Sequence, residues 1–417
     1  MKKLIISIIL LSLTVLAFAS FDDFEENPAN IGGREFGDII LPGFEFSGGF
    51  TNNHLQFSDL MMFEKDHVLT ESEKDKLISA DLNFAGYGKL NLLSFGYRNW
   101  EFSVNNHSMG YLGDIDKELF EIAFNGNTED EYHQTVVSDS YFYNFVKGKL
   151  NWTYPMGLNL SFVPIFDIAT KNSSEIVYGL EGILNYMREM NIYLGANINF
   201  YNANGYMEVM ESSQTIISTP DSLHFTNNLQ AVYTDPDITV NTGMNLGAGI
   251  GMKLELPHGW FHFGIDDLGV KMQYDDLVVN SYTNYFKDYL DYLDEDHEVI
   301  DESEEGEEEP YEGGVELELS PTIVWGAEYN VGRGFTLMAK YLQSDYVIDG
   351  FFMGTTYRPV QWLPFKLIYG SGDIDTYKFN FGFDTESFEV KFGMITYNGM
   401  FNGAKGYGTD FGIRIKF

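Results

Sequence analysis

Residues 244–256 read MNLGAGIGMKLEL. Every second residue from Met244 to Leu256 is apolar, and the residues between them are asparagine, glycine, lysine or glutamate. This strict alternation gives a β-strand one apolar and one polar face. The stretch is longer than an average strand of about five or six residues, and it exceeds the roughly 9–11 residues with which a tilted strand crosses a membrane. It therefore predicts a transmembrane strand, with a large soluble β-sandwich or propeller as the alternative.

The same alternation recurs along the chain and predicts an all-β fold. We expect a transmembrane antiparallel up-and-down β-barrel of 14–16 strands, with short periplasmic turns and long outer loops. Our count favours 16 strands, with 14 as the alternative, and either even number places both termini on the inner side. The strands are predicted at residues 43–51, 86–96, 99–107, 141–154, 158–168, 176–188, 191–202, 243–256, 260–279, 314–330, 334–345, 350–358, 364–370, 375–384, 387–397 and 407–417.

The N-terminal stretch MKKLIISIILLSLTVLAFAS has the features of a secretory signal peptide, because two lysines precede an apolar run and Ala17-Phe18-Ala19 forms a small-x-small cleavage site. A retained membrane anchor is the alternative, although the apolar run is shorter than a helical span requires. The predicted organisation is a signal peptide at 1–19, an N-terminal segment at 20–42 and the barrel at 43–417.

The composition is strongly acidic, with 62 Asp and Glu against 25 Lys and Arg and a net charge of −37. This charge argues against nucleic acid as a partner. The chain contains no cysteine, so disulfides cannot hold the fold. We find no motif typical of a hydrolase, a zinc protease or a phosphate-binding loop, and we expect neither enzymatic activity nor a cofactor.

The chain ends on DFGIRIKF, which alternates in the same way. Its apolar face carries Phe411, Ile413, Ile415 and Phe417. The pattern resembles the C-terminal assembly signal of bacterial outer-membrane proteins, which ends in an aromatic residue. The resemblance implies a location in the bacterial cell outer membrane, with membrane lipid and the barrel-assembly machinery as partners of this face.

A long acidic outer loop is expected at 280–313, because DYLDEDHEVIDESEEGEEEPYEGG (291–314) lacks any Lys or Arg. Hard cations such as Ca²⁺ prefer carboxylate oxygens, but the spacing of a formed calcium loop is missing. A solvated, mobile loop is therefore the favoured interpretation, preceded by a short helix of tyrosines near residues 282–292. The weak candidates for a divalent-cation site are Asp294, Asp296, Asp301 and Glu304.

Two further outer segments are expected to be long loops, at 108–140 and 203–242. The first contains apolar residues at helical spacing between Ile115 and Ala123, which predicts a small helix. The four tryptophans Trp100, Trp152, Trp260 and Trp362 fall near predicted strand ends, as in an aromatic girdle, whereas Trp325 falls deeper in its strand.

Alternation also predicts which charged side chains face the lumen. Acids outnumber bases in this set, so an open pore is expected to prefer cations. The lumen-facing candidates are Lys253, Glu255, Glu316, Glu318, Glu328, Glu389, Lys391 and Arg414.

Several short motifs together resemble known barrel families. The motif Asn27-Pro28-Ala29-Asn30 resembles the N-terminal motif of the long-chain fatty-acid transporter barrels and of type IX secretion outer-membrane barrels. The stretches 41–63, 119–127 and 264–276 resemble an uncharacterised family of bacterial outer-membrane barrels distantly related to both. The resemblance implies about 14 strands and an N-terminal segment in the lumen, where it acts as a hatch in the fatty-acid transporters.

Two functions follow as expectations. The leading one is a channel or transporter for small or hydrophobic solutes, with the N-terminal segment as a plug. The alternative is a non-conducting structural or secretion scaffold of the outer envelope.

Overall fold

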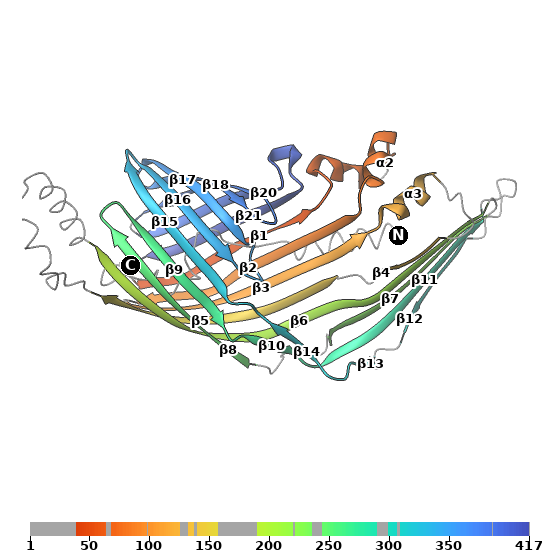
Figure 1. Ribbon diagram of the computed structural model, residues 1–417, viewed down its shortest axis with the longest axis horizontal. Helices are drawn as coiled ribbons and strands as arrows, with labels where there is room; N and C mark the ends of the chain where they lie inside the picture. The colour runs from red at the N-terminus through yellow and green to blue at the C-terminus, as the bar shows by residue number, and fades with distance from the viewer. Residues whose placement is uncertain are drawn as a thin grey trace, which may run out of the picture.

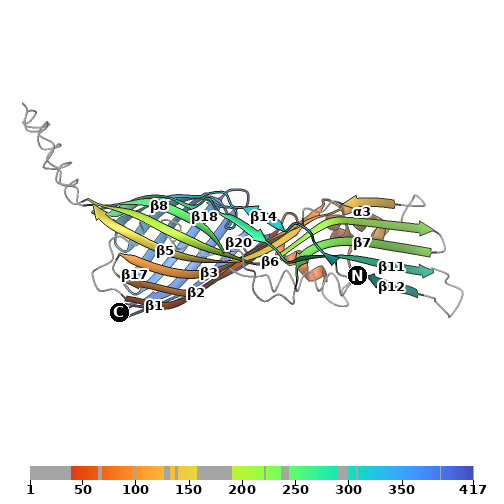
Figure 2. The same ribbon diagram turned by 90° about the horizontal axis from the view of Figure 1, so that it is seen from below.

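The computed structural model of the chain is a closed antiparallel β-barrel with a projecting outer sheet (Figures 1 and 2). The structure describes residues 39–63, 68–97, 99–125, 132–136, 140–156, 190–219, 222–235, 244–289, 299–306, 309–385 and 387–416.

The barrel wall contains 14 strands, each paired with the next, and the last strand pairs back with the first. Closure leaves no free strand edge within the wall, which a membrane requires because lipid offers no hydrogen bonds to the backbone. The wall strands in order are β1 (Ile39–Asn52), β2 (Leu82–Tyr97), β3 (Trp100–Ile115), β5 (Tyr141–Met156), β6 (Asn191–Thr219), β8 (Met244–Leu256), β9 (Gly259–Leu268), β15 (Thr322–Gly332), β16 (Phe335–Gln343), β17 (Gly350–Val360), β18 (Leu363–Ser371), β19 (Thr376–Asp384), β20 (Phe388–Tyr397) and β21 (Gly406–Lys416).

The favoured count of 16 strands was wrong, and the alternative of 14 is confirmed. The two surplus strands, predicted at 158–168 and 176–188, lie outside the described residues. β5 is hydrogen-bonded directly to β6, from the pair Tyr141–Glu208 to the pair Met156–Ile192. The wall therefore passes from β5 to β6 without another strand between them.

The predicted two faces are clearest in β8. Leu246 and Ile250 are 59% and 57% exposed on the barrel exterior, whereas Gly247 and Gly249 are buried on the inner side. Large apolar side chains are exposed in the same way on every strand from β15 to β21. A soluble sandwich would bury such faces against each other. The continuous apolar exterior of a closed barrel is instead the surface that faces lipid, so the chain is an integral outer-membrane barrel.

Aromatic side chains gather at both ends of this exterior. At the end with the short turns, the rings of Trp100 and Trp152 lie 6.2 Å apart, and Trp362 stacks on Phe383. The predicted deeper position of Trp325 was wrong. β15 begins at Thr322, so Trp325 lies near its outer end.

The sheet of the wall continues beyond the barrel. The strand β6 is 29 residues long, and its outer half pairs with β7 (Ser222–Thr234) and β4 (Tyr132–Val136). β7 pairs with β11 (Leu277–Tyr289), which pairs with β12 (Val299–Glu305) and β13 (Glu309–Pro310). Both views show this outer blade projecting away from the barrel.

The outer blade corrects three expectations. Residues 203–219 and 222–234 are strands rather than a polar loop, and the tyrosines of 282–289 lie in β11 rather than in a helix. Part of the acidic stretch, Val299–Glu305, is also a strand. Outside the membrane neither face of a sheet has to be apolar, and the outer half of β6 shows no period-two alternation. β7 does alternate, with Leu223, Phe225, Leu229, Ala231 and Tyr233 on one face, so its pattern was overlooked.

The predicted strand 314–330 is two strands. β14 (Val315–Glu318) pairs with β10 (Lys271–Tyr274) in a small separate sheet, and β15 begins only at Thr322. Leu319, between them, is buried in a core cluster with Val270 and Met272 rather than exposed to lipid. A proline and a serine at 320–321 interrupt the ladder at this point.

Short helices cover the outer rim. They are η3 (Phe57–Phe63), α2 (Glu71–Leu77), α3 (Lys117–Asn125) and η5 (Phe401–Gly403). α3 confirms the helix predicted around residues 115–123. Its Phe120 and Phe124 pack against Leu77 and Leu82. No helix in the described part of the chain is long and apolar enough to span a bilayer.

Candidate functional site

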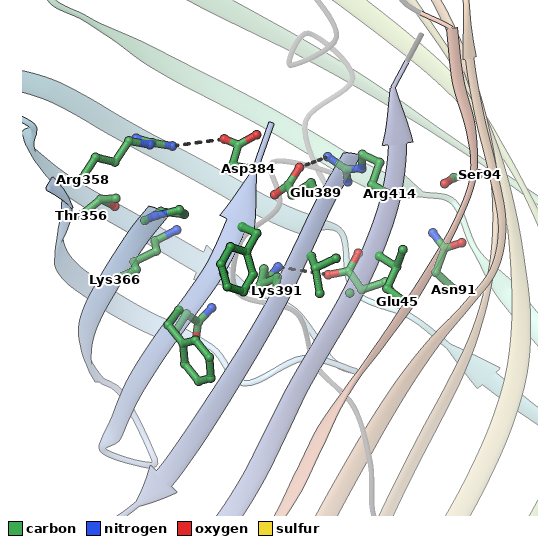
Figure 3. Close-up of a pocket in the computed structure, with 18 of the residues that line it drawn as sticks. Glu45, Asn91, Ser94, Thr356, Arg358, Lys366, Asp384, Glu389, Lys391 and Arg414 are labelled. Atoms are coloured by element: carbon green, nitrogen blue, oxygen red, sulfur yellow. Dashed lines mark hydrogen bonds and ion pairs between the residues drawn. The ribbon is translucent and has the colours of Figure 1, made fainter. Parts of the chain in front are cut away.

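A cavity of about 200 Å³ opens into the lumen at the end of the barrel that carries the short turns (Figure 3). Its lining comes from β1, β2, β15 and the strands from β17 to β21. The charged residues of the lining are four acids and four bases: Glu45, Glu328, Asp384 and Glu389, and Arg358, Lys366, Lys391 and Arg414.

The charges of the cavity face each other in long ion pairs. Arg358 lies 3.8 Å from Asp384, and Arg414 lies 3.8 Å from Glu389. Lys391 reaches Glu45 at 3.4 Å (Figure 3). The first two pairs are about a third exposed, so water screens them and each contributes little to stability. The cavity is therefore a hydrated, polar space with both signs of charge.

Farther from the turns, the lumen contains a fully buried ion pair. Lys378 lies 2.6 Å from Asp410, and neither side chain is exposed. Asn380 donates a hydrogen bond of 3.2 Å to the same carboxylate, and Lys391 lies 3.8 Å from it. Gly393 separates Asn380 from Asp410 in the ladder, and an added Cβ there would lie 2.5 Å from Asn380 Oδ1. The glycine thus makes room for the polar contact.

The outer half of the lumen contains a buried cluster of four charges from two strands. Lys149 of β5 lies 2.7 Å from Asp266 of β9. Lys147 lies 2.6 Å from Asp267 and 3.1 Å from Asp266. Polar neighbours satisfy the remaining carboxylate oxygens: Asn199 donates to Asp266 at 2.7 Å, and Thr322 donates to Asp267 at 2.7 Å. Buried charges need such complete pairing, because each unpaired one costs several kcal/mol.

Asp266 and Asp267 are consecutive, yet both carboxylates are buried in the lumen. A β-bulge permits this, because the register between β8 and β9 shifts between the pairs Ala248–Leu268 and Ile250–Ile265. At the bulge Asp267 has φ +60°, a left-handed conformation that aspartate tolerates better than most residues. Gly249 faces the bulge, where an added Cβ would lie 2.5 Å from Asp266 Oδ1.

The loop between β16 and β17, residues 344–349, folds into the mouth of the barrel; we call it the lid. The Tyr346 hydroxyl donates one hydrogen bond to Asp267 at 2.5 Å and accepts one from Lys147 at 2.9 Å. Burial and the Asp267 carboxylate raise the pKa of Tyr346 well above its usual value, so the hydroxyl stays protonated and donates. On the lid backbone, the carbonyl of Asp345 accepts a hydrogen bond of 3.0 Å from Tyr143.

The lid joins two hydrophobic clusters that fill the outer half of the lumen. Tyr346 belongs to a cluster with Phe145 and Tyr201, whereas Ile348 packs against a cluster that contains Phe352 and Tyr397. Val347 packs against both. Packed side chains therefore occupy the outer half of the described lumen, while its other end contains the polar cavity.

The predicted lumen-facing residues fall into three groups. Glu328, Glu389, Lys391 and Arg414 line the cavity. Lys253 and Glu255 lie near Tyr193, whose hydroxyl donates to Glu255 at 3.1 Å. The remaining two, Glu316 and Glu318, are exposed on β14 and pair with Lys271 outside the barrel wall, so their assignment to a wall strand was wrong.

Sequence reasoning missed the buried charges. Lys147 and Lys149 alternate with Val146, Gly148 and Leu150, so the period-two pattern of β5 could have identified both lysines. Asp266 and Asp267 could not be assigned to one face, because alternation sends consecutive residues to opposite faces and only the bulge overrides it.

The buried and cavity-lining charges no longer support the expected preference of an open pore for cations. Without Glu316 and Glu318, the predicted set contains three acids and three bases. The cavity has four of each, and so do the buried positions of the described wall: Glu45, Asp266, Asp267 and Asp410 against Lys147, Lys149, Lys340 and Lys378. The excess negative charge of the chain lies elsewhere.

Other predicted features lie wholly or partly outside the described residues. These are the signal peptide, the plug motif Asn27, Pro28, Ala29 and Asn30, the acidic residues Asp294 and Asp296, and Phe417. Asp301 and Glu304 lie in β12, where they pair with Phe286 and Thr283 of β11. β1 begins at Ile39, so the last residues of the predicted N-terminal segment belong to the wall.

No protein-family model matches the chain, and no curated protein matches it. Solved structures do. The chain is similar to the Pseudomonas putida toluene transporter TodX, with 8% identity, a TM-score of 0.38, and coverage of 94% of this chain and 91% of that one. It is similar to a Pseudomonas aeruginosa FadL homologue, with 8% identity, a TM-score of 0.37, and coverage of 94% and 92%. It is also similar to a variant of the Rhodopseudomonas blastica porin, with 11% identity, a TM-score of 0.23, and coverage of 91% and 100%.

Proposed function

We propose that the chain is a gated channel or transporter of the outer membrane, opened by movement of the lid at 344–349. One observation carries the proposal. The lid and the clusters it joins pack within the outer half of the described lumen, whereas the inner end keeps a polar cavity of about 200 Å³. A polar cavity is not expected in a non-conducting scaffold. A loop held in the lumen by buried polar contacts is not expected in a permanently open porin.

The cavity supports small polar solutes over hydrophobic ones. Its eight charged side chains come from both signs and are partly hydrated. An apolar solute in this position would strip water from charged groups without replacing their hydrogen bonds, which is unfavourable. A small solute that carries both donors and acceptors, or both charges, would replace them.

The N-terminal segment enters the proposal as a second barrier. Its motif at 27–30 resembles that of barrels in which this segment acts as a hatch. A deletion that tests the segment should cover residues 20–38 and leave β1 intact, because residues 39–42 belong to that strand.

Single-channel conductance in planar bilayers tests both barriers. We expect little or no conductance from the intact barrel and discrete steps from Tyr346→Ala, because this change removes the ring that joins the lid to Phe145 and the hydroxyl that binds Asp267. The matched control is Tyr369→Ala, which removes an exposed tyrosine from the lipid-facing side of β18. Steps from both tyrosine variants, or from neither even when each is combined with the 20–38 deletion, would contradict lid gating.

Recording Tyr346→Ala and the 20–38 deletion, each alone and both together, distinguishes the two barriers. Steps that need both Tyr346→Ala and the 20–38 deletion would mean two gates in series. Steps after the deletion alone would make the N-terminal segment the gate. Silence from every variant, from protein that still shows a heat-modifiable barrel on a gel, would favour the scaffold, whose supporting observation is the long outer blade.

A further inference from the structure

The hairpin loop between β20 and β21, residues 398–405, presents two large apolar side chains at the outer rim. Met400 is 54% exposed and Phe401 is 64% exposed. They lie in or beside the single turn of η5. Exposing such side chains to water loses the free energy that their burial would provide, so their position points to a covering partner.

The backbone is strained to hold them there. Phe401 has φ +51° and Asn398 has φ +49°, both in the left-handed region, and Gly399 has φ +146°. For a bulky residue such as phenylalanine this conformation is a real outlier. Strained backbone is often kept where it serves a function, so the strain beside this exposed ring favours a role for the ring in binding.

The loop folds over the outside of the barrel rather than over its mouth. Tyr407 lies on the outward face of β21, and its hydroxyl donates a hydrogen bond to the carbonyl of Phe401. On the same tyrosine, the ring of Phe57 from η3 packs at 4.6 Å. Phe57 is itself exposed. Phe57, Met400 and Phe401 therefore form one patch beside Tyr407, which we call the rim patch.

The position of the rim patch matches the outer boundary of the membrane. Ile415 lies near the inner end of the lipid-facing side of β21, and Tyr407 lies eight residues farther along the strand. With about 3.4 Å per residue and a tilt of about 45°, this separation is about 19 Å along the membrane normal. The apolar band of such barrels is about 25 Å tall, so the rim patch continues the lipid-facing surface at its upper edge.

We propose that the rim patch inserts into the outer leaflet at the boundary between headgroups and acyl chains and anchors the helical cap formed by η3, α2 and η5. The occupant is lipid rather than a second copy of the chain, because the patch is continuous with the lipid-facing wall. The proposal is independent of whether the barrel conducts.

The lack of cysteine in the chain makes the test direct. A single nitroxide is attached to Phe401→Cys in protein reconstituted into liposomes, and its collisions with dissolved oxygen and with a water-soluble nickel chelate are measured. Oxygen concentrates among acyl chains, whereas the chelate stays in water. The lipid-facing reference is Ile250→Cys, and the water-facing reference is Val68→Cys, which replaces a residue 85% exposed on the outer segment before α2.

We expect the oxygen-to-nickel ratio at position 401 to be several-fold above that at position 68 and below that at position 250. A ratio equal to that at position 68 would overturn the proposal. Spin–spin broadening at position 401 that grows with the protein-to-lipid ratio would also overturn it, because it would make a second copy the occupant. If the label disturbs the turn, Phe57→Cys reports on the same patch from η3, where φ is not strained.

Discussion

The Tyr346 hydroxyl, on the loop between β16 and β17, donates a hydrogen bond of 2.5 Å to the buried carboxylate of Asp267, 79 residues away at the end of β9. The same carboxylate accepts hydrogen bonds from Lys147, Thr322 and Tyr201. One aspartate in a strained conformation thus connects the lid to the wall on both sides of the lumen. Any opening of the lid must break this contact.

Replacing the hydroxyl alone measures the strength of the contact. Tyr346→Phe keeps the ring in its cluster but removes the donor to a charged acceptor, a hydrogen bond worth about 1.5–3 kcal/mol. If lid opening limits conduction, open probability in single-channel records should rise roughly 10- to 150-fold over the intact barrel. Tyr346→Ala should raise it further, since it also removes packing. An open probability for Tyr346→Phe equal to that of the intact barrel would show that the hydroxyl does not hold the lid.

Removing one buried charge should destabilise the barrel. Asp266→Asn leaves Lys149 and part of the charge of Lys147 uncompensated in the lumen, which typically costs about 3–5 kcal/mol. The measurement is the free energy of unfolding from urea titration in lipid vesicles. The matched control is Glu316→Gln, which breaks an exposed pair with Lys271 and should cost at most about 1 kcal/mol. Equal losses in the two variants would mean that water hydrates the Asp266 cluster.

The two faces of the wall should respond differently to arginine. Ile250→Arg places a charge on the lipid-facing side of β8 and should cost about 2–4 kcal/mol near the midplane. Ser94→Arg places the same charge in the polar cavity near Glu45, where water and an acid are present, and should cost less. Equal costs, measured by the same urea titration, would contradict the assignment of the exterior to lipid. Gly249 is unsuitable as the inner-face position, because any side chain there meets Asp266.

Lid closure should depend on pH through Asp349. Burial, followed by the nearby charge of Asp373, raises the pKa of Asp349 above its ordinary value of 3.8. The closed lid then binds this proton more tightly than an open lid in which the carboxyl is hydrated. Closure is therefore most favourable below pH 3.8 and weakens as the pH rises through the raised pKa.

Single-channel recordings at a series of pH values from 4 upward test the direction of this pH dependence. The recordings use Tyr346→Phe, because its open probability is expected to exceed that of the intact barrel. This open probability should increase from pH 4 upward and level off. Adding Asp349→Asn should flatten that rise, and adding Asp373→Asn should shift it to lower pH, because it removes the second cause. A rise that survives both additions would assign the pH dependence to another group.

The wall of the barrel could be predicted from sequence because its signal is local. Strands such as β8 and β19 carry the apolar side chains of one face at every second residue, and lipid requires that pattern over the whole span. The outer half of β6 lies beyond the membrane and carries no such pattern, so it could not be predicted. β7 does alternate, but the alternation of one strand does not show which strand it pairs with. The break between β14 and β15 was missed for a related reason, since alternation runs unbroken from Val315 to Tyr329 although the ladder does not.

The residues alone were enough to predict the fold class and the lipid-facing side of the strands, and four of the eight predicted lumen residues line the polar cavity. Each of these depends on the period of a strand, which is a property of neighbouring residues. Which charges form ion pairs depends instead on the register between strands that are distant in the sequence. Lys147 forms an ion pair with Asp267, and Lys378 forms one with Asp410. In both cases the two residues lie on different strands. The bulge at Asp267 and the inward fold of the lid likewise depend on packing between distant segments. A pattern among neighbouring residues does not predict such packing.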